Sequence, residues 1–178
     1  MILAEAVGKT GKVLALEASA HDAAMGERNR KLNGYENLEI VKAAVSERSG
    51  KLTFTTADRV YRGDDYEGRV MINSFSIDDL AGRYGHPDVI FMDIERYELN
   101  ALRGARKVLG TTLDCFVEVH AGVGLESYGG SVEELLSFFP SEKYELMVRN
   151  DADEDFVPLE PKDARLKSRF FLLAFGKL

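Results

Sequence analysis

The chain has 178 residues, which is long enough for one domain with its own hydrophobic core, and we expect a single domain over residues 1–178. It carries 23 Lys and Arg against 30 Asp and Glu, and the resulting net charge of −7 argues against nucleic acid as a partner. Its single cysteine, Cys115, excludes a disulfide framework, and no apolar run is long enough to cross a membrane, so we expect a cytoplasmic protein without a membrane partner.

Apolar runs and turn residues predict the secondary structure along the chain. Residues 1–7 are typical of the end of a helix, and Ser76 is expected to cap a later helix because Asp79 follows three residues on. The pattern predicts further helices at 21–33, 97–109 and 132–139. It predicts strands at 12–16, 38–45, 52–56, 70–75, 89–94, 115–119, 144–149 and 170–175. Residues 57–68 and the glycine-containing segment 121–131 are expected to be surface loops.

The order of these elements predicts an α/β fold. Strands that alternate with helices indicate a doubly wound, mostly parallel, Rossmann-like sheet with helices on both faces. The last two strands depart from this alternation, because residues 150–169 join them without a clear helix. An antiparallel strand at one edge of the sheet would explain that ending.

The most informative segment is the strand that ends in acidic residues. The run from Val89 to Ile94 is almost continuously apolar, which is typical of a strand buried on both faces of a parallel sheet. Asp93, Glu95 and Glu98 gather where this strand should end. Carboxylates are costly to bury unless they are paired, and ligands of open α/β sheets bind at the carboxyl ends of strands. These acids are therefore candidates for holding a ligand, acting as a base or binding a divalent ion.

A second strand end adds a histidine to these acids. Glu118 and His120 are two residues apart, so their side chains point the same way along the strand CFVEV. If the two strands are neighbours, His120 lies close to Asp93 and Glu95 and is a candidate general base or part of a carboxylate–imidazole metal site. A structural histidine that hydrogen-bonds a carboxylate is the competing interpretation. No zinc-type ligand spacing accompanies these residues, so we predict no dedicated metal site.

Two earlier strand ends are candidates for binding a nucleoside. Glu17 ends the strand KVLAL, where a carboxylate can accept hydrogen bonds from both hydroxyls of a ribose. Capping of the following helix is the alternative role. Ala43 and Ala44 end the strand at 38–45, and their small side chains would let a flat base lie against the sheet, although a tightly packed turn is equally compatible with them.

Several motifs occur in the order seen in one family. The chain contains GKVLALEAS, ERNRKLNGYENLEIVKAAVSERSGKLTF, SIDDL, PDVIFMDIERYELNALRGARKVL and DCFVEVH. This succession resembles FkbM-type methyltransferases over about residues 8–120, with an acid-ended strand, an acidic core similar to D-x-E-G-Y-E and a closing E-x-H.

The resemblance implies a fold, a cofactor and roles for the site residues. It implies the class I methyltransferase fold and S-adenosylmethionine-dependent methylation, mostly of hydroxyl oxygens, on a small molecule or sugar. Glu17, with Ala43 and Ala44, would then bind the cofactor, and Asp93 would sit near its methionine end. His120 would be the first choice of base and Asp93 the second, with Glu95, Glu98 and Glu118 facing the substrate. The oligomeric state stays open, with a homo-oligomer as one option.

Two departures from the family pattern affect the expected function. Arg96 stands where the family usually has glycine, which would strain the backbone if that position needs positive φ. The family's first strand and its glycine-rich cofactor loop should precede residue 1, so we expect an N-terminally truncated domain. These departures keep a catalytically silent binding or scaffold module open as an alternative. A metal-dependent hydrolase that uses Asp93, Glu95 and His120 is the third hypothesis.

Overall fold

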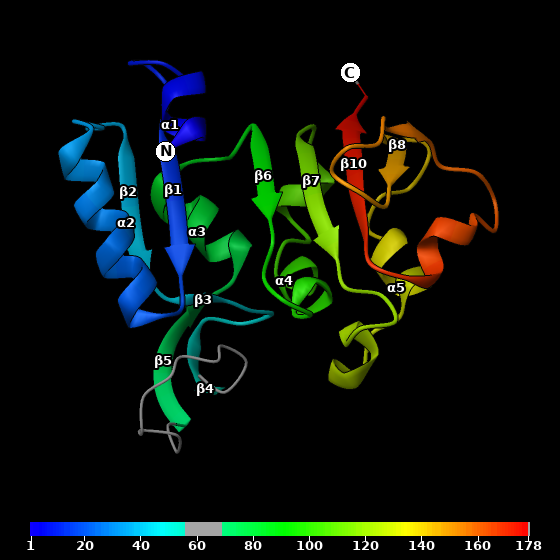
Figure 1. Ribbon diagram of the computed structural model, residues 1–178, viewed down its shortest axis with the longest axis horizontal. Helices are drawn as coiled ribbons and strands as arrows, with labels where there is room; N and C mark the ends of the chain where they lie inside the picture. Colours follow the sequence, from blue (N-terminus) through cyan, green and yellow to red (C-terminus); the bar gives the residue numbers. More distant parts are fainter. Residues whose placement is uncertain (56–68, 178) are drawn as a thin grey trace. The chain divides into compact units, whose positions relative to one another are not determined.

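The computed structural model describes residues 1–55 and 69–177, and its elements are labelled in Figure 1. Contacts divide the chain into two units, Met1–Phe75 and Ser76–Leu178, and each is described by itself. The single domain expected from the sequence stays a prediction. The loop expected at 57–68 lies outside the described residues. Among the described residues, no helix combines the length and apolarity needed to cross a membrane.

The first unit contains two small sheets. Strands β1 (Val13–Glu17) and β2 (Leu38–Lys42) are parallel and are joined by helix α2 (Ala20–Leu32). In the other sheet, β5 (Arg69–Phe75) lies between β3 (Ala44–Val45), which is parallel to it, and the antiparallel β4 (Gly50–Thr55). Helix α1 (Ile2–Ala6) precedes β1, as the sequence predicts. The strand expected at 38–45 is interrupted at Ala43 and forms both β2 and β3.

Local interactions explain where the first elements begin and end. The Ser19 side chain accepts the Asp22 N–H and caps α2, and Gly34 follows the helix with a φ of 67° that glycine adopts without strain. Gly26 brings α2 close to β2, because a Cβ at this position would lie 2.8 Å from Cδ1 of Ile40. The side chain of Asn37 donates to the carbonyl oxygens of Ala4 and Gly8, which ties the end of α1 to the start of β2.

The second unit is a five-stranded sheet with short helices. Strands β6 (Val89–Met92) and β7 (Asp114–Val119) are parallel, and the sheet order is β6-β7-β10-β8-β9. The last strand, β10 (Phe170–Gly176), is antiparallel to both β7 and β8 (Tyr144–Arg149). The remaining elements are α3 (Ile77–Tyr84), α4 (Glu98–Arg103), the 3-10 turn η2 (Val108–Gly110), η3 (Leu125–Tyr128), α5 (Val132–Leu136), β9 (Val157–Pro158) and η4 (Ala164–Lys167).

One expectation about this sheet is met and another needs correction. The antiparallel edge strand expected from the sequence is present as the short β9, while the final strand β10 lies inside the sheet. Central placement pairs both sides of the β10 backbone and buries Phe170, Leu172 and Ala174. The expectation that β6 is buried on both faces is wrong, since Val89 and Phe91 are 58% and 55% exposed. Within the described residues β6 pairs only with β7, where the Phe91 ring stacks on Phe116.

The core of the second unit lies against the sheet face opposite to the one that carries Phe91. The apolar helix face predicted from Leu99, Leu102, Ala105 and Leu109 is confirmed, because all four side chains are buried. The helix itself is shorter than expected, and η2 continues after α4 ends at Arg103. Ser76 caps α3 by accepting the Asp79 N–H, as predicted. The hydroxyl of the buried Tyr144 donates to the carbonyl oxygen of Leu109 and fastens β8 to η2.

Cys115 should be chemically silent in the folded protein. Its side chain is 1% exposed, and burial raises the pKa of the thiol to about 12. Only the thiolate reacts with disulfide reagents, so we expect no reaction with dithiobis(nitrobenzoic acid) at pH 8 without denaturant and one thiol per chain in guanidinium chloride. Full reaction in native buffer would contradict this packing of β7.

Candidate functional site

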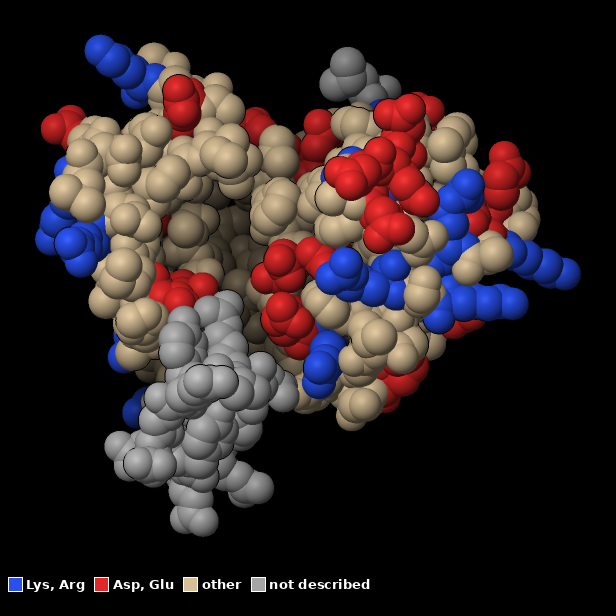
Figure 2. Space-filling model, viewed as in Figure 1, with Lys and Arg blue, Asp and Glu red and all other residues tan. Residues whose placement is uncertain are grey.

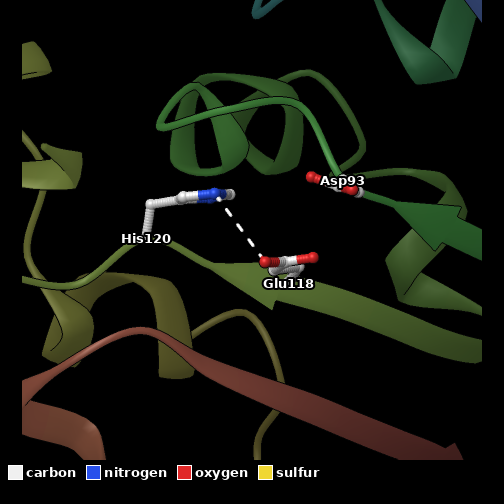
Figure 3. Close-up of side chains that lie close together, drawn as sticks. All are labelled: Asp93, Glu118 and His120. Atoms are coloured by element: carbon white, nitrogen blue, oxygen red, sulfur yellow. Dashed lines mark ion pairs between the residues drawn. The ribbon is translucent and has the colours of Figure 1, made fainter. Parts of the chain in front are cut away.

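The neighbouring ends of β6 and β7 bring an acidic cluster and a histidine together. Asp93 follows β6, while Glu118 lies at the end of β7 and His120 directly after it. One oxygen of each carboxylate and one ring nitrogen of His120 all lie within 4.8 Å of one another (Figure 3). The juxtaposition predicted from the two strand ends is therefore present, because the parallel pairing of β6 and β7 puts both carboxyl ends at the same sheet edge.

The imidazole of His120 is buried and held in one orientation. Its side chain is 7% exposed, and Nδ1 lies 2.7 Å from Oε1 of Glu98. The same oxygen accepts the backbone N–H of Arg96 at 2.7 Å. Because this oxygen already accepts the N–H of Arg96, we assign the proton of the ring to Nδ1, from which His120 donates to Glu98. In the neutral ring, Nε2 then carries a lone pair.

Nε2 of His120 faces the other carboxylates of the site. Nε2 lies 3.3 Å from Oε2 of Glu95 and 3.9 Å from Oε1 of Glu118. Figure 3 shows the ring projecting from the end of β7 toward Glu118 and Asp93. Glu95 is largely exposed, whereas Glu118 is mostly buried. The arrangement suits a group that takes a proton from a ligand at the exposed side of the cluster.

Glu98 is placed differently from the expectation that it faces a substrate. It is the first residue of α4, its side chain has no exposed surface, and its bonds are to Arg96 and His120. No described donor reaches its second oxygen, Oε2. Burial raises the pKa of this carboxyl, while the backbone N–H groups of Glu98 and Arg96 and the His120 side chain oppose that shift.

An arginine that the sequence reasoning missed completes the electrostatics of the site. Arg169 comes immediately before β10, and its guanidinium lies 3.2 Å from Oε1 of Glu118 and over the ring of Phe171. Burial, with the neighbouring charge of Asp93, raises the pKa of the Glu118 carboxyl, and Arg169 opposes that shift. Acidic and basic groups also lie beside one another on the molecular face drawn in Figure 2.

The cluster has the donor types of a cation site. Asp93, Glu118 and His120 each offer one ligand atom, and carboxylate oxygens with an imidazole nitrogen suit several divalent metals. Glu118 is already paired with Arg169, however, and the three side chains alone do not define a metal centre. We therefore assign no ion to them.

The turn between β6 and α4 is strained. Glu95 and Arg96 have φ of 51° and 80°, in the region that L-residues other than Asn and Asp rarely adopt. Position 96 thus has the geometry that favours glycine, which answers the question raised by its arginine. The Arg96 side chain lies against Gly124 of the loop after β7, where an added Cβ would come 2.1 Å from Cδ of Arg96.

The candidate nucleoside-binding residues belong to the first unit. Glu17 ends β1, and its Oε1 accepts the N–H of Ser19, the N-cap residue of α2. Ala43 is buried at the end of β2 and donates its N–H to the carbonyl oxygen of Glu17, while Ala44 begins β3. Glu17 therefore lies beside the two alanines at one strand edge. Its bond to Ser19 also agrees with the alternative of a role at the start of the helix.

Similar proteins define the class to which this arrangement belongs. A methyltransferase FkbM from Methylobacillus flagellatus has a solved structure with a TM-score of 0.57 and 19% identity, covering 96% of this chain and 40% of that one. A SAM-dependent O-methyltransferase from Thermotoga maritima has a TM-score of 0.52 and 17% identity, covering 99% of this chain and 54% of that one. The chain has the Rossmann-like fold of class I methyltransferases, as predicted.

The sequence comparisons identify the family. Residues 2–146 match the model of the methyltransferase FkbM domain, and the chain therefore belongs to the FkbM methyltransferase family. A curated relative, the hexuronic acid methyltransferase AglP of Haloferax volcanii, is 30% identical over 122 residues, which are 66% of this chain and 48% of the relative. The chain thus spans about half the length of this relative.

Replacing Arg96 by glycine should stabilise the protein. Relief of the left-handed backbone is worth about 1–2 kcal/mol. The greater freedom of glycine in the unfolded chain offsets about 0.4–1 kcal/mol of this gain. We expect the free energy of unfolding of Arg96→Gly, measured in urea, to rise by about 0.5–1 kcal/mol.

Lys162→Gly is the matched control, because Lys162 also has positive φ, at 63°, but belongs to the connection before β10. Both variants should gain stability if backbone strain dominates. A gain for Lys162→Gly together with a loss for Arg96→Gly would show that the contacts of the Arg96 side chain outweigh the strain.

Proposed function

We propose that this chain is part of an S-adenosylmethionine-dependent methyltransferase that methylates a hydroxyl oxygen of a small molecule or sugar. The observation that carries the proposal is the buried His120 imidazole, held at Nδ1 by Glu98 and turned with Nε2 toward Glu95 and Glu118 at the strand ends of an FkbM domain. The name of the Haloferax volcanii relative supports a sugar acid as the first acceptor to try.

The reaction needs one proton acceptor. S-adenosylmethionine supplies an activated methyl group on a sulfonium. As the acceptor oxygen bonds to the methyl carbon and the carbon–sulfur bond breaks, the hydroxyl proton must leave. Nε2 of His120 takes this proton in the proposed mechanism, and Asp93 is the second candidate. Glu95 and Glu118, whose carboxylates lie within 4 Å of Nε2, contact the acceptor in this mechanism.

The first unit has residues that fit the cofactor. Glu17 uses Oε1 for the Ser19 N–H, and a carboxylate keeps further acceptor positions with which to hold the two ribose hydroxyls. Ala44 has no side-chain atoms beyond Cβ and is only partly buried, so a flat base can approach the backbone of this strand edge there, whereas the buried Ala43 offers it no surface.

The role of His120 can be tested with matched histidine variants. His120→Ala should lower kcat for transfer of a labelled methyl group to a hexuronic acid by about 10²-fold or more, since a positioned base contributes 10²–10⁴-fold. Its affinity for S-adenosylmethionine, measured by calorimetry, should not change. His86→Ala is the control, because His86 is exposed and bonds Thr111 outside the cluster.

Three other results would overturn parts of this proposal. Equal kcat values for His120→Ala and the parent protein would remove His120 as the base. Cofactor binding without transfer to any hydroxyl would favour the silent binding module that Arg96 suggests. Cofactor-independent hydrolysis that disappears with chelator would favour the metal-dependent hydrolase.

Glu17 provides a separate test of cofactor binding. Glu17→Gln keeps an oxygen for the Ser19 N–H but loses the charge and one acceptor, so we expect S-adenosylmethionine to bind about 10-fold more weakly, as loss of one charged hydrogen bond implies. Glu39→Gln, an exposed position in the neighbouring β2, is the control. Unchanged affinity in Glu17→Gln would leave Glu17 with only its role at the start of α2.

A further inference from the structure

We infer that Glu98 is a positioning residue that sets the tautomer of His120 and the path of the turn carrying Glu95. The effect of Glu98 on catalysis rests on the proposed function. In this inference Glu98 does not make the substrate contact that the sequence predicts. Glu98 has no exposed surface with which to touch a substrate. It acts through two N–H groups that it holds on one oxygen.

The first argument is the tautomer. Free histidine in water prefers the proton on Nε2, but the acceptor at 2.7 Å from Nδ1 requires it there instead. Without Glu98, a proton on Nε2 would find Oε2 of Glu95 as its acceptor at 3.3 Å. The ring would then face the ligand side with a donor and could accept nothing. Glu98 is therefore what leaves Nε2 able to take a proton.

The second argument is the turn. Oε1 of Glu98 also accepts the N–H of Arg96, the second of two consecutive residues with positive φ. This bond holds the peptide group that joins Glu95 to Arg96, so one atom locates both Nδ1 of the ring and the backbone next to Glu95. The distance between Glu95 and Nε2 follows from two bonds to the same oxygen.

The third argument is that this residue is unfavourable for stability alone. Burial raises the pKa of the Glu98 carboxyl, and Oε2 has no donor among the described residues. Because the folded state holds this proton more tightly than the unfolded state, the contribution of Glu98 to stability is present below about pH 4 and is lost as pH rises. A residue that cannot ionise would avoid this loss of stability, so the carboxyl group is explained by what it does to His120.

Two variants of Glu98 separate orientation from charge. In Glu98→Gln, the two N–H donors require the amide oxygen at the position of Oε1, so both hydrogen bonds and the His120 tautomer should persist. Its melting temperature should equal or exceed that of the parent. In Glu98→Leu, both donors lose their acceptor, and His120 should carry its proton on Nε2. Glu142→Gln, at an exposed position before β8, is the surface control.

The tautomer of His120 is read from the NMR chemical shifts of its imidazole nitrogens and carbons. They are measured at about pH 9, where a free imidazole is neutral. His21 and His86 serve as references within the same spectrum. We expect the Nδ1–H form in the parent, Glu98→Gln and Glu142→Gln, and the Nε2–H form in Glu98→Leu. An Nδ1–H form in Glu98→Leu, or an Nε2–H form in the parent, would overturn the inference whether or not the protein methylates a hydroxyl.

Kinetics then test the consequence for transfer. Glu98→Leu should lower kcat about 10²-fold with little change in the KM of the acceptor, as expected when a base is lost. Glu98→Gln should lose less than about 10-fold, because its base stays oriented. A raised KM with unchanged kcat in both variants would instead make Glu98 a direct substrate contact and contradict its positioning role.

Discussion

One buried carboxylate oxygen holds the candidate site together. Oε1 of Glu98 accepts an N–H from the strained turn after β6 and another from the ring after β7. It thereby joins two segments that are more than twenty residues apart in the chain, inside a region from which water is excluded. In such surroundings, a hydrogen bond to an ionised oxygen is stronger than at the surface, and its loss leaves buried donors without partners.

The strand register determines which groups this oxygen can organise. Met92 pairs with Val117 in the parallel pair β6 and β7, so the next positions, Asp93 and Glu118, lie level with each other. His120 follows two residues later and points the same way as Glu118. The antiparallel β10 contributes from the opposite direction, because Phe170 pairs with Val119 and Arg169 therefore arrives at the same edge. The site is a consequence of where three strands begin and end.

Much of this arrangement could be predicted from local sequence patterns. The parts that could not be predicted depend on physical causes that local patterns do not show. Apolar runs followed by acids identify the ends of β6 and β7, and their convergence follows from parallel pairing. The inward direction of Glu98 has a signal in the helix period, since Leu102 and Ala105 lie four and seven residues later and are buried. The sequence alone instead groups Glu98 with the acids that face a substrate, because its side chain is charged. Arg169 had no local signal, because it follows a long irregular connection and reaches Glu118 only through the pairing of β10 inside the sheet.

Two locally unfavourable features of the second unit meet in a single hydrogen bond. Arg96 has a backbone conformation that suits glycine, and Glu98 is an acid without exposure, yet the N–H of the first is held by the carboxylate of the second. Neither feature is required to build the sheet, whose core is formed by apolar residues of β7, β10 and α4. Sequences depart from local rules mainly where function demands it. Both departures converge on His120, so the imidazole, rather than the more numerous exposed acids around it, is the group that the surrounding structure is built to hold.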